Sequence, residues 1–165
     1  MAHVKDFSLC IHAGANAGFY AKQYSKRFKT VIAVEPHPVN FQCLNLNVPE
    51  GNVIKIQGAL GDCHGWGSLF SFDGVSNMGG WKVVPGRDFP FLTIDDFLGE
   101  VGLIHLDVEG YEYEVLSGAQ DALSSSPVVA LETIRPEKDQ LAREYLEGFG
   151  YSVKETLPHD TVYTK

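Results

Sequence analysis

Short apolar runs alternate with amphipathic segments along most of this chain. Five of the runs are nearly continuous in apolar residues: 7–11, 30–34, 53–57, 103–106 and 128–131. Strands buried on both faces of a parallel sheet have this character. Helical patterns follow them over 19–28, 39–46, 94–98, 111–123 and 137–149. The alternation predicts a Rossmann-like three-layer α/β sandwich with right-handed crossovers and helices on both faces of the sheet.

The end of the chain departs from this rhythm. Two β-rich runs, 152–156 and 161–163, are separated by only four residues. Such a short connection cannot hold a crossover helix, so it predicts an antiparallel hairpin. We therefore expect a seven-stranded, mostly parallel sheet with this hairpin at one edge.

The stretch 63–91 interrupts the pattern with glycines and aromatic residues. It is expected to be a hairpin or lid inserted into one domain that spans residues 1–165, a length typical of single domains. Its aromatic side chains have two interpretations of equal standing. They cover a sheet edge, or they form a wall for the acceptor of a reaction.

Charge and cysteine content narrow the partners and the compartment. The net charge of −8 argues against nucleic acid, which requires clustered Lys and Arg. Three cysteines without a Cys-x-x-Cys spacing favour a reducing cytosol over a disulfide framework. The N-terminal residues lack an apolar signal core, and no run reaches the roughly 20 residues of a membrane span. A cytoplasmic protein without a membrane partner is expected.

A glycine-containing loop follows the first strand. Gly14, Asn16 and Gly18 leave little side-chain bulk at the start of a helix. Glu35 follows the second strand, 21 residues after Gly14, where a carboxylate accepts hydrogen bonds from ribose hydroxyls. A pyrophosphate-binding loop requires Gly-x-Gly-x-x-Gly, and here Asn16 and Phe19 stand at the second and third glycines. The pattern favours a nucleoside cofactor without phosphates over NAD.

Acidic residues follow the fourth strand. Asp107 is the leading candidate for a general base, because it ends the strand nearest the cofactor loop. Glu109 is the second candidate, with helix capping as its alternative. His105 lies two residues before Asp107 and is expected on the same strand face, so His-x-Asp-x-Glu also allows a metal site. We favour a core histidine and no metal. Glu132, which follows the fifth strand, either lines an acceptor pocket or begins a helix.

Several segments together resemble the FkbM-type methyltransferases, a branch of the class I S-adenosylmethionine-dependent enzymes. His12 to Gly18 is similar to the family's Asp-Val-Gly-Ala-Asn-x-Gly pattern, and Val31 to Asn40 to its Glu-Pro-x-Pro-x-Asn pattern. Further similar segments are 59–62, 92–98, 106–110 and 115–119, so the resemblance spans about residues 11–132. The Asp-Val-Glu-Gly segment followed by a Gly-Ala helix is the most specific of them.

The resemblance implies roles for individual residues. S-adenosylmethionine would be the cofactor, with Glu35 and the adjacent Pro36 at its ribose and Asp107 at the reacting centre. The residues implied around the methionine part are Ala13, Gly14, Asn16 and Gly18, and those against the adenine are Gly58, Ala59 and Leu60.

His12 departs from the family pattern, which has Asp there. We expect a neutral His12 beside the cofactor, because an imidazolium would repel the cofactor's ammonium and sulfonium groups and weaken its binding at acid pH. The alternative is a hydrogen-bonded residue at the end of a strand.

The sequence thus predicts an S-adenosylmethionine-dependent methyltransferase, with oxygen of a small-molecule or carbohydrate hydroxyl as the acceptor. The oxygen preference comes from the resemblance alone. One alternative is a nucleoside-binding module with little or no turnover. A less favoured alternative is an NAD-linked oxidoreductase. The pattern identifies neither the acceptor nor the oligomeric state.

Overall fold

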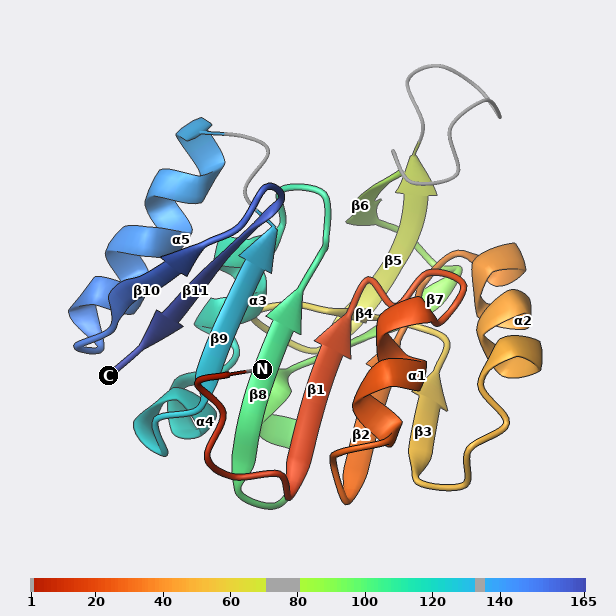
Figure 1. Cartoon of the computed structure of the whole chain (residues 1–165). Coiled ribbons are helices and arrows are strands. Elements are labelled where there is room, and N and C mark those ends of the chain that lie inside the picture. The colour runs from red at the N-terminus through yellow and green to blue at the C-terminus, as the bar shows by residue number, and fades with distance from the viewer. Residues whose placement is uncertain (1, 71–80, 133–135) are drawn as a thin grey trace.

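Seven strands form the central sheet of the computed structural model, which describes residues 2–70, 81–132 and 136–165 (Figure 1). Their order is β10-β11-β9-β8-β1-β2-β3. Strand β11 runs in the direction opposite to the other six strands of this sheet. The predicted mostly parallel sheet with a C-terminal hairpin is therefore confirmed. The strands are β1 Leu9–Ala13, β2 Thr30–Val34, β3 Val53–Ile56, β8 Val101–Leu106, β9 Val128–Glu132, β10 Ser152–Thr156 and β11 Asp160–Thr164.

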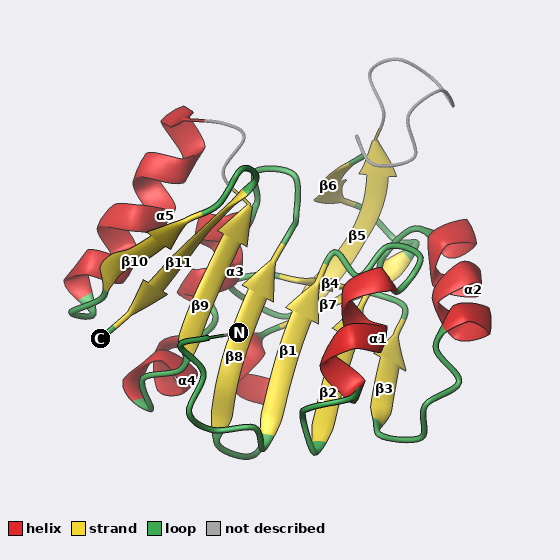
Figure 2. Cartoon of the chain, in the orientation of Figure 1, coloured by secondary structure: helices red, strands yellow, loops and turns green. Residues whose placement is uncertain are grey.

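Helices cover the sheet on two sides (Figure 2). Helices α1 Phe19–Ser25 and α2 Pro38–Asn47 lie on one side, and α3 Glu112–Ser117, α4 Gln120–Ser124 and α5 Pro136–Gly148 lie on the other. Alternation along β1 divides its side chains between the two layers. Ile11 belongs to the apolar cluster under α3, α4 and α5, and Cys10 to the cluster under α1 and α2. The same alternation directs His12 toward α1.

Two of the predicted α-helices were wrong: one segment is a 3-10 turn, and the other is divided into two helices. Residues 94–98 form a single 3-10 turn, Ile94–Asp96, and 111–123 form two short helices instead of one. The break at Gly118 has a packing reason, since a Cβ there would lie 2.1 Å from the carbonyl oxygen of Gly61. Helix α4 then begins anew, and the Asp95 carboxylate accepts hydrogen bonds from the Asp121 and Ala122 amides. The first strand also lies two residues later than the predicted 7–11.

A second sheet, which the sequence pattern did not reveal, stands beyond the carboxyl ends of β1 and β2 (Figure 1). Its order is β4-β7-β5-β6, with β5 antiparallel to both β6 and β7. Its strands are β4 Ala59–Leu60, β5 Gly65–Phe70, β6 Lys82–Pro85 and β7 Phe89–Leu92. Residues 71–80 lie outside the described residues, so the hairpin or lid over 63–91 stays a prediction as a whole.

The order of the central sheet reverses between β1 and β8. In open α/β sheets ligands bind at such a point, beyond the carboxyl ends of the strands. Among the helices of the described ranges, none has the length and apolar character needed to cross a membrane.

Candidate active site

A cleft opens at the carboxyl ends of β1, β2, β8 and β9 and is closed on one side by the second sheet. The space free of atoms in this cleft, including space open to solvent, is about 820 Å³. Ten of the predicted site residues line it: Ala13, Gly14, Asn16, Glu35, Pro36, Gly58, Ala59, Leu60, Asp107 and Glu109. Residues not predicted for the cofactor or catalysis also line it: Val34, His37, Asn40, Leu69, Trp81, Val83, Val108, Tyr111 and Glu132.

The loop after β1 lies directly against the loop after β8. The Asp107 amide donates a hydrogen bond to the carbonyl of Ala13 (3.1 Å), and the Gly14 amide donates to the carbonyl of Val34 (3.0 Å). Gly14 has φ +76°, in the left-handed region. A Cβ at Gly14 would lie 1.7 Å from the carbonyl oxygen of Asp107. Only glycine fits here, and it allows the loop after β1 to contact the loop after β8 directly.

Glu35 is a buried carboxylate that organises the loops around it. Its Oε2 accepts a hydrogen bond from the Asn16 amide (2.8 Å), and its Oε1 accepts from the His37 amide (2.9 Å). The Asn40 side chain also donates to Oε1 (3.5 Å). Burial raises the pKa of Glu35, although these hydrogen bonds favour its ionised form. Glu35 thus joins the first loop to the second while it faces the cleft.

An apolar wall follows β3. Ala59 and Leu60 are buried and pair with Phe91 and Leu92 of β7, which joins this wall to the second sheet. A Cβ at Gly58 would lie 2.9 Å from the carbonyl oxygen of Pro90. The chain therefore passes close to the second sheet before it forms the wall.

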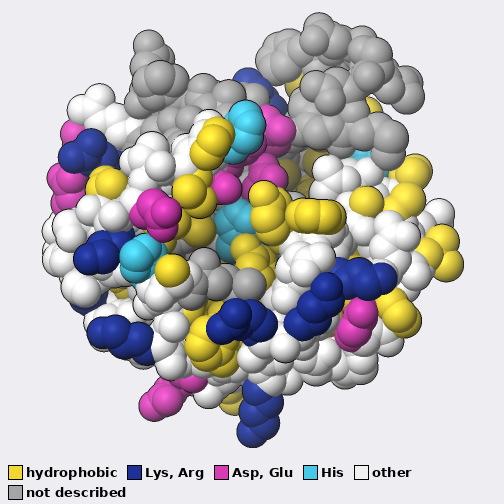
Figure 3. Space-filling view, viewed as in Figure 1, with side chains coloured by type: hydrophobic (Ala, Val, Ile, Leu, Met, Phe, Trp, Pro, Cys, Tyr) yellow, Lys and Arg dark blue, Asp and Glu magenta, His cyan; other side chains and the backbone are white. Residues whose placement is uncertain are grey.

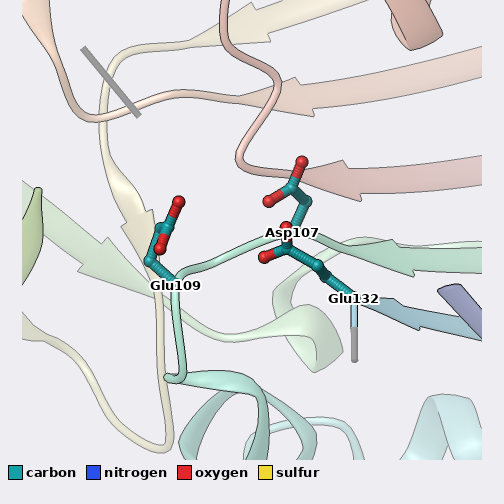
Figure 4. Close-up of side chains that lie close together, drawn as sticks. All are labelled: Asp107, Glu109 and Glu132. Atoms are coloured by element: carbon teal, nitrogen blue, oxygen red, sulfur yellow. The ribbon is translucent and has the colours of Figure 1, made fainter. Parts of the chain in front are cut away.

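Three carboxyl groups gather in the lining of the cleft. Oxygens of Asp107, Glu109 and Glu132 all lie within 4.8 Å of one another (Figure 4). Burial, followed by the negative charge and hydrogen bond of Asp107, raises the pKa of Glu132 to about 8. Carboxylates gather in this way with and without a bound cation, so the cluster alone does not identify a metal site.

A residue that the sequence analysis missed holds the acidic loop. Glu112 is buried, and its Oε1 accepts hydrogen bonds from the amides of Val108 (3.3 Å) and Gly110 (3.2 Å). Glu109 and Gly110 both have left-handed backbones, with φ +56° and +88°. Capping of the following helix was the alternative role expected for Glu109. In the structure it is Glu112 that accepts hydrogen bonds from the backbone amides just before α3. An acidic residue in the first turn of the helix was the available signal.

The family profile "Methyltransferase FkbM domain" matches residues 12–153. The chain belongs to the FkbM methyltransferase family. It is accordingly an S-adenosylmethionine-dependent methyltransferase, and the resemblance read from the sequence is confirmed. No curated protein sequence matches the chain.

Solved structures support the class I methyltransferase fold of this FkbM domain. Precorrin-6y C5,15-methyltransferase from Geobacter metallireducens GS-15 is 18% identical (TM-score 0.58), with 98% of this chain and 81% of that chain covered. Precorrin 8w decarboxylase from Methanobacterium thermoautotrophicum is 14% identical (TM-score 0.62; 99% and 84% covered). An S-adenosylmethionine-dependent O-methyltransferase from Thermotoga maritima is 13% identical (TM-score 0.61; 98% and 60% covered). At these identities the likeness concerns the fold alone.

The cleft of the FkbM domain has features that suit S-adenosylmethionine. The Gly14 loop lines the cleft, and the fixed Glu35 carboxylate offers acceptors for hydroxyl groups. Ala59 and Leu60 supply an apolar surface suited to a purine ring. These residues fit the cofactor of the family, although their individual roles stay predictions.

Two predicted cofactor residues lie outside the lining of the cleft. His12 lies on the α1 side of the sheet, as its place in β1 requires. Gly18 precedes α1, and a Cβ there would lie 2.5 Å from the Val48 side chain and 2.8 Å from that of Leu44. Gly18 therefore allows α1 to pack closely against α2 and the residue after it.

His12 is part of a buried aromatic cluster. Its ring stacks on that of His105 (centroids 4.6 Å apart) and meets the rings of Tyr20 and Tyr24 edge-on. His12 is 1% exposed, and neither of its ring nitrogens has a hydrogen-bond partner among the described residues. Burial, followed by the neighbouring His105, lowers its pKa well below 6.5. The expected neutral form is thus supported, whereas the hydrogen-bonded alternative is not.

His105 has partners of its own outside the acidic loop. Strand β8 ends at Leu106, and the expectation that His105 and Asp107 share a face stays a prediction. The His105 Nδ1 lies 2.9 Å from the Tyr24 hydroxyl, and its Nε2 lies 3.6 Å from Asp160. Its two nitrogens are therefore directed to these partners, as the core-histidine interpretation requires.

Charge is unevenly distributed over the face that carries α1. Lys and Arg side chains gather along its lower part, while Asp and Glu side chains gather near the carboxyl ends of the central strands (Figure 3). The described lining of the cleft contains Glu and Asp but no Lys or Arg. The potential in the cleft therefore favours a cationic ligand.

Proposed function

We propose that this methyltransferase transfers its methyl group to a hydroxyl oxygen of a small-molecule or carbohydrate acceptor. The observation that supports this most directly is the carboxylate of Asp107 in the cleft, beside the glycine loop. A hydroxyl must lose its proton as it is methylated, and a positioned carboxylate is a suitable acceptor for that proton.

The residues of the cleft have separate tasks in this proposal. Bound S-adenosylmethionine supplies an electrophilic methyl group on a positively charged sulfur. The Gly14 loop, Glu35 and the Ala59 wall hold that cofactor in place, while Asp107 directs the acceptor oxygen and takes its proton. Glu109 is the second candidate for the proton. Alignment and exclusion of water then provide most of the rate enhancement.

The second sheet offers the acceptor wall. Leu69 and Val83 contribute apolar surface, and the half-buried Trp81 contributes an aromatic face. Aromatic faces pack well against the apolar face of a sugar ring or another small ring. This supports the acceptor-wall interpretation of the 63–91 stretch. With the acidic cleft, it also favours a small acceptor over nucleic acid.

A transfer assay tests the proposal. Labelled S-adenosylmethionine is incubated with the protein and a panel of sugars, small phenols and alcohols, amines and RNA, and the methylated atom is identified by mass spectrometry and NMR. We expect O-methylation that Asp107→Asn reduces at least about 100-fold, the usual contribution of an acid–base group. Asp88→Asn, at an exposed site outside the cleft, is the matched control.

Other outcomes of the assay would contradict the proposal. Methylation confined to nitrogen atoms or to RNA would show that the proposed acceptor class, a hydroxyl of a small molecule or carbohydrate, is wrong. Cofactor binding without any transfer across the panel would favour the nucleoside-binding module. If the Asp107→Asn variant is as active as the unmodified protein, Asp107 is not the base.

A further inference from the structure

Glu132 and Asp107 form a pair that joins the ends of two neighbouring strands. Glu132 is the last residue of β9, and Asp107 follows β8. Both side chains line the cleft, and their carboxyl groups are directed toward one another (Figure 4). A side-chain hydrogen bond with Asp107 favours the protonated form of Glu132. Two carboxyl groups in this arrangement share a proton more readily than both ionise.

The surroundings of Glu132 reinforce that sharing. Glu109 of the same loop and Glu112 of α3 add negative charge, and the register of β11 sets Asp160 opposite Glu132. The described lining of the cleft offers no Lys or Arg as counter-charge. Burial is the largest cause of the raised pKa of Glu132, followed by Asp107 and then by the charges of Glu109 and Glu112, and the pKa lies at about 8.

We propose that Glu132 is a further acid–base residue of the site: it shares one proton with Asp107 in the free protein and releases it when the cationic cofactor binds. This inference rests on the proposed function. S-adenosylmethionine carries a sulfonium and an ammonium group, and positive charge near the pair favours its fully ionised form. Proton and cofactor therefore compete, so cofactor affinity rises with pH.

The release prepares the pair for the reaction. When the acceptor oxygen bonds to the methyl carbon, the sulfur–carbon bond breaks and its electron pair stays on sulfur. The hydroxyl proton then passes to the ionised Asp107–Glu132 pair. A pair that still holds the shared proton is a weaker base, because its remaining carboxylate already accepts a hydrogen bond from the protonated partner. Filling of the cofactor site thus sets the protonation state that the acceptor needs.

Calorimetry measures the release directly. S-adenosylmethionine is titrated into the protein at pH 7.5 in buffers of different ionisation enthalpy, which gives the protons released per cofactor bound. We expect a substantial fraction of one proton for the unmodified protein and close to none for Glu132→Gln. Glu109→Gln, which removes a carboxylate from the same cluster, is the matched control and is expected to keep most of the release.

The dissociation constants give a second readout. S-adenosylhomocysteine lacks the sulfonium charge, so the preference for S-adenosylmethionine is expected to increase between pH 6 and pH 9, by about tenfold for each unit by which the sulfonium lowers the pKa of the pair. The same ratio in Glu132→Gln corrects for ionisation of the ligands and is expected to change less. Binding without proton release, or an equal pH dependence in both proteins, would overturn the inference.

A cofactor-free measurement separates this inference from the proposed function. Carbon-13 NMR of labelled glutamate carboxyl groups follows each titration in the free protein. One glutamate that titrates well above the others, and whose signal Glu132→Gln removes, supports proton sharing even where transfer is not detected. Titration of every glutamate in the usual range overturns it. Failure of both ligands to bind would instead refute the cofactor-coupled release together with the proposed function.

Discussion

The carbonyl oxygen of Asp107 occupies the space that a β-carbon on Gly14 would need. The hypothetical contact is 1.7 Å, and Gly14 also has a left-handed backbone. Gly14→Ala must therefore separate the loops after β1 and β8. We expect it to lower the free energy of unfolding by more than about 2 kcal/mol. The melting temperature falls by at least about 4 °C, which thermal unfolding measures.

Gly51→Ala is the control for this experiment, because a Cβ at Gly51 meets no atom within 4 Å. It is expected to change the unfolding free energy by less than about 0.5 kcal/mol. Equal melting temperatures for the two alanine variants would show that the loops can separate at little cost.

Glu35→Gln should weaken cofactor binding. An amide has one acceptor oxygen, whereas the Glu35 carboxylate receives the Asn16 and His37 amides on different oxygens. One of these amides would lose its partner at a site that is 5% exposed. We expect about a tenfold increase in the dissociation constant of S-adenosylhomocysteine, measured by calorimetry.

Glu100→Gln, an exposed change just before β8, provides the comparison for Glu35. It should bind the ligand as the unmodified protein does. An affinity of Glu35→Gln that matches this control would mean that Glu35 has no part in holding the cofactor.

His12 should make the fold sensitive to acid. Because its pKa in the folded protein lies below 6.5, the unfolded chain binds a proton first as the pH falls through 6.5, and stability decreases. The loss between pH 7.5 and pH 5.5 is about 1 kcal/mol, or about 2–4 °C in melting temperature. His12→Phe keeps an aromatic ring without the titrating group and should remove this part of the loss.

His159→Gln removes an exposed histidine from the loop between β10 and β11 and serves as the reference. It should retain the acid sensitivity of the unmodified protein. If His12→Phe retains it as well, the buried ring is not its source.

Glu132 should lower the stability of the fold as the pH rises, whereas His12 lowers it as the pH falls. Its raised pKa means that the folded protein keeps a proton that the unfolded chain loses, so stability decreases as the pH rises from 4.5 to about 8. Glu132→Gln cannot ionise and should avoid this loss. We expect its melting temperature, relative to the unmodified protein, to rise by about 2–4 °C between pH 5 and pH 8.5, after allowance for solvent screening.

Glu144→Gln, an exposed change on α5, controls for the loss of a carboxylate. Its melting temperature should follow that of the unmodified protein at both pH values. The same behaviour in Glu132→Gln would show that Glu132 is ionised throughout this range.

The sequence indicated the central sheet because its strands are continuous apolar runs that end at recognisable loops. It did not indicate the second sheet, whose strands contain Gly65, Gly67 and Pro90 and bury few side chains completely. The break at Gly118 also escaped prediction, because its cause is the backbone of Gly61, far away in the chain. Local patterns do not report such contacts.

Some residues of the site could likewise be predicted from the sequence, and others could not. Gly14, Glu35 and Asp107 were recognisable because each closely follows a predicted strand, at the sheet edge where ligands bind. The positions of His12 and Glu112 were harder to infer, since their roles depend on which side chain lies beside them. His12 stacks on His105 from another strand, and Glu112 receives amides of a left-handed turn.

The two sheets divide the walls of the cleft between them. The central sheet carries Gly14, Glu35 and Asp107, whereas the second sheet carries Leu69 and Val83. Substitutions at the latter two positions can reshape one wall while the hydrogen bonds of Glu35 remain intact. Leu69 and Val83 are therefore the positions at which engineering of the proposed acceptor range can begin, while the Gly14 loop and Glu35 keep their geometry.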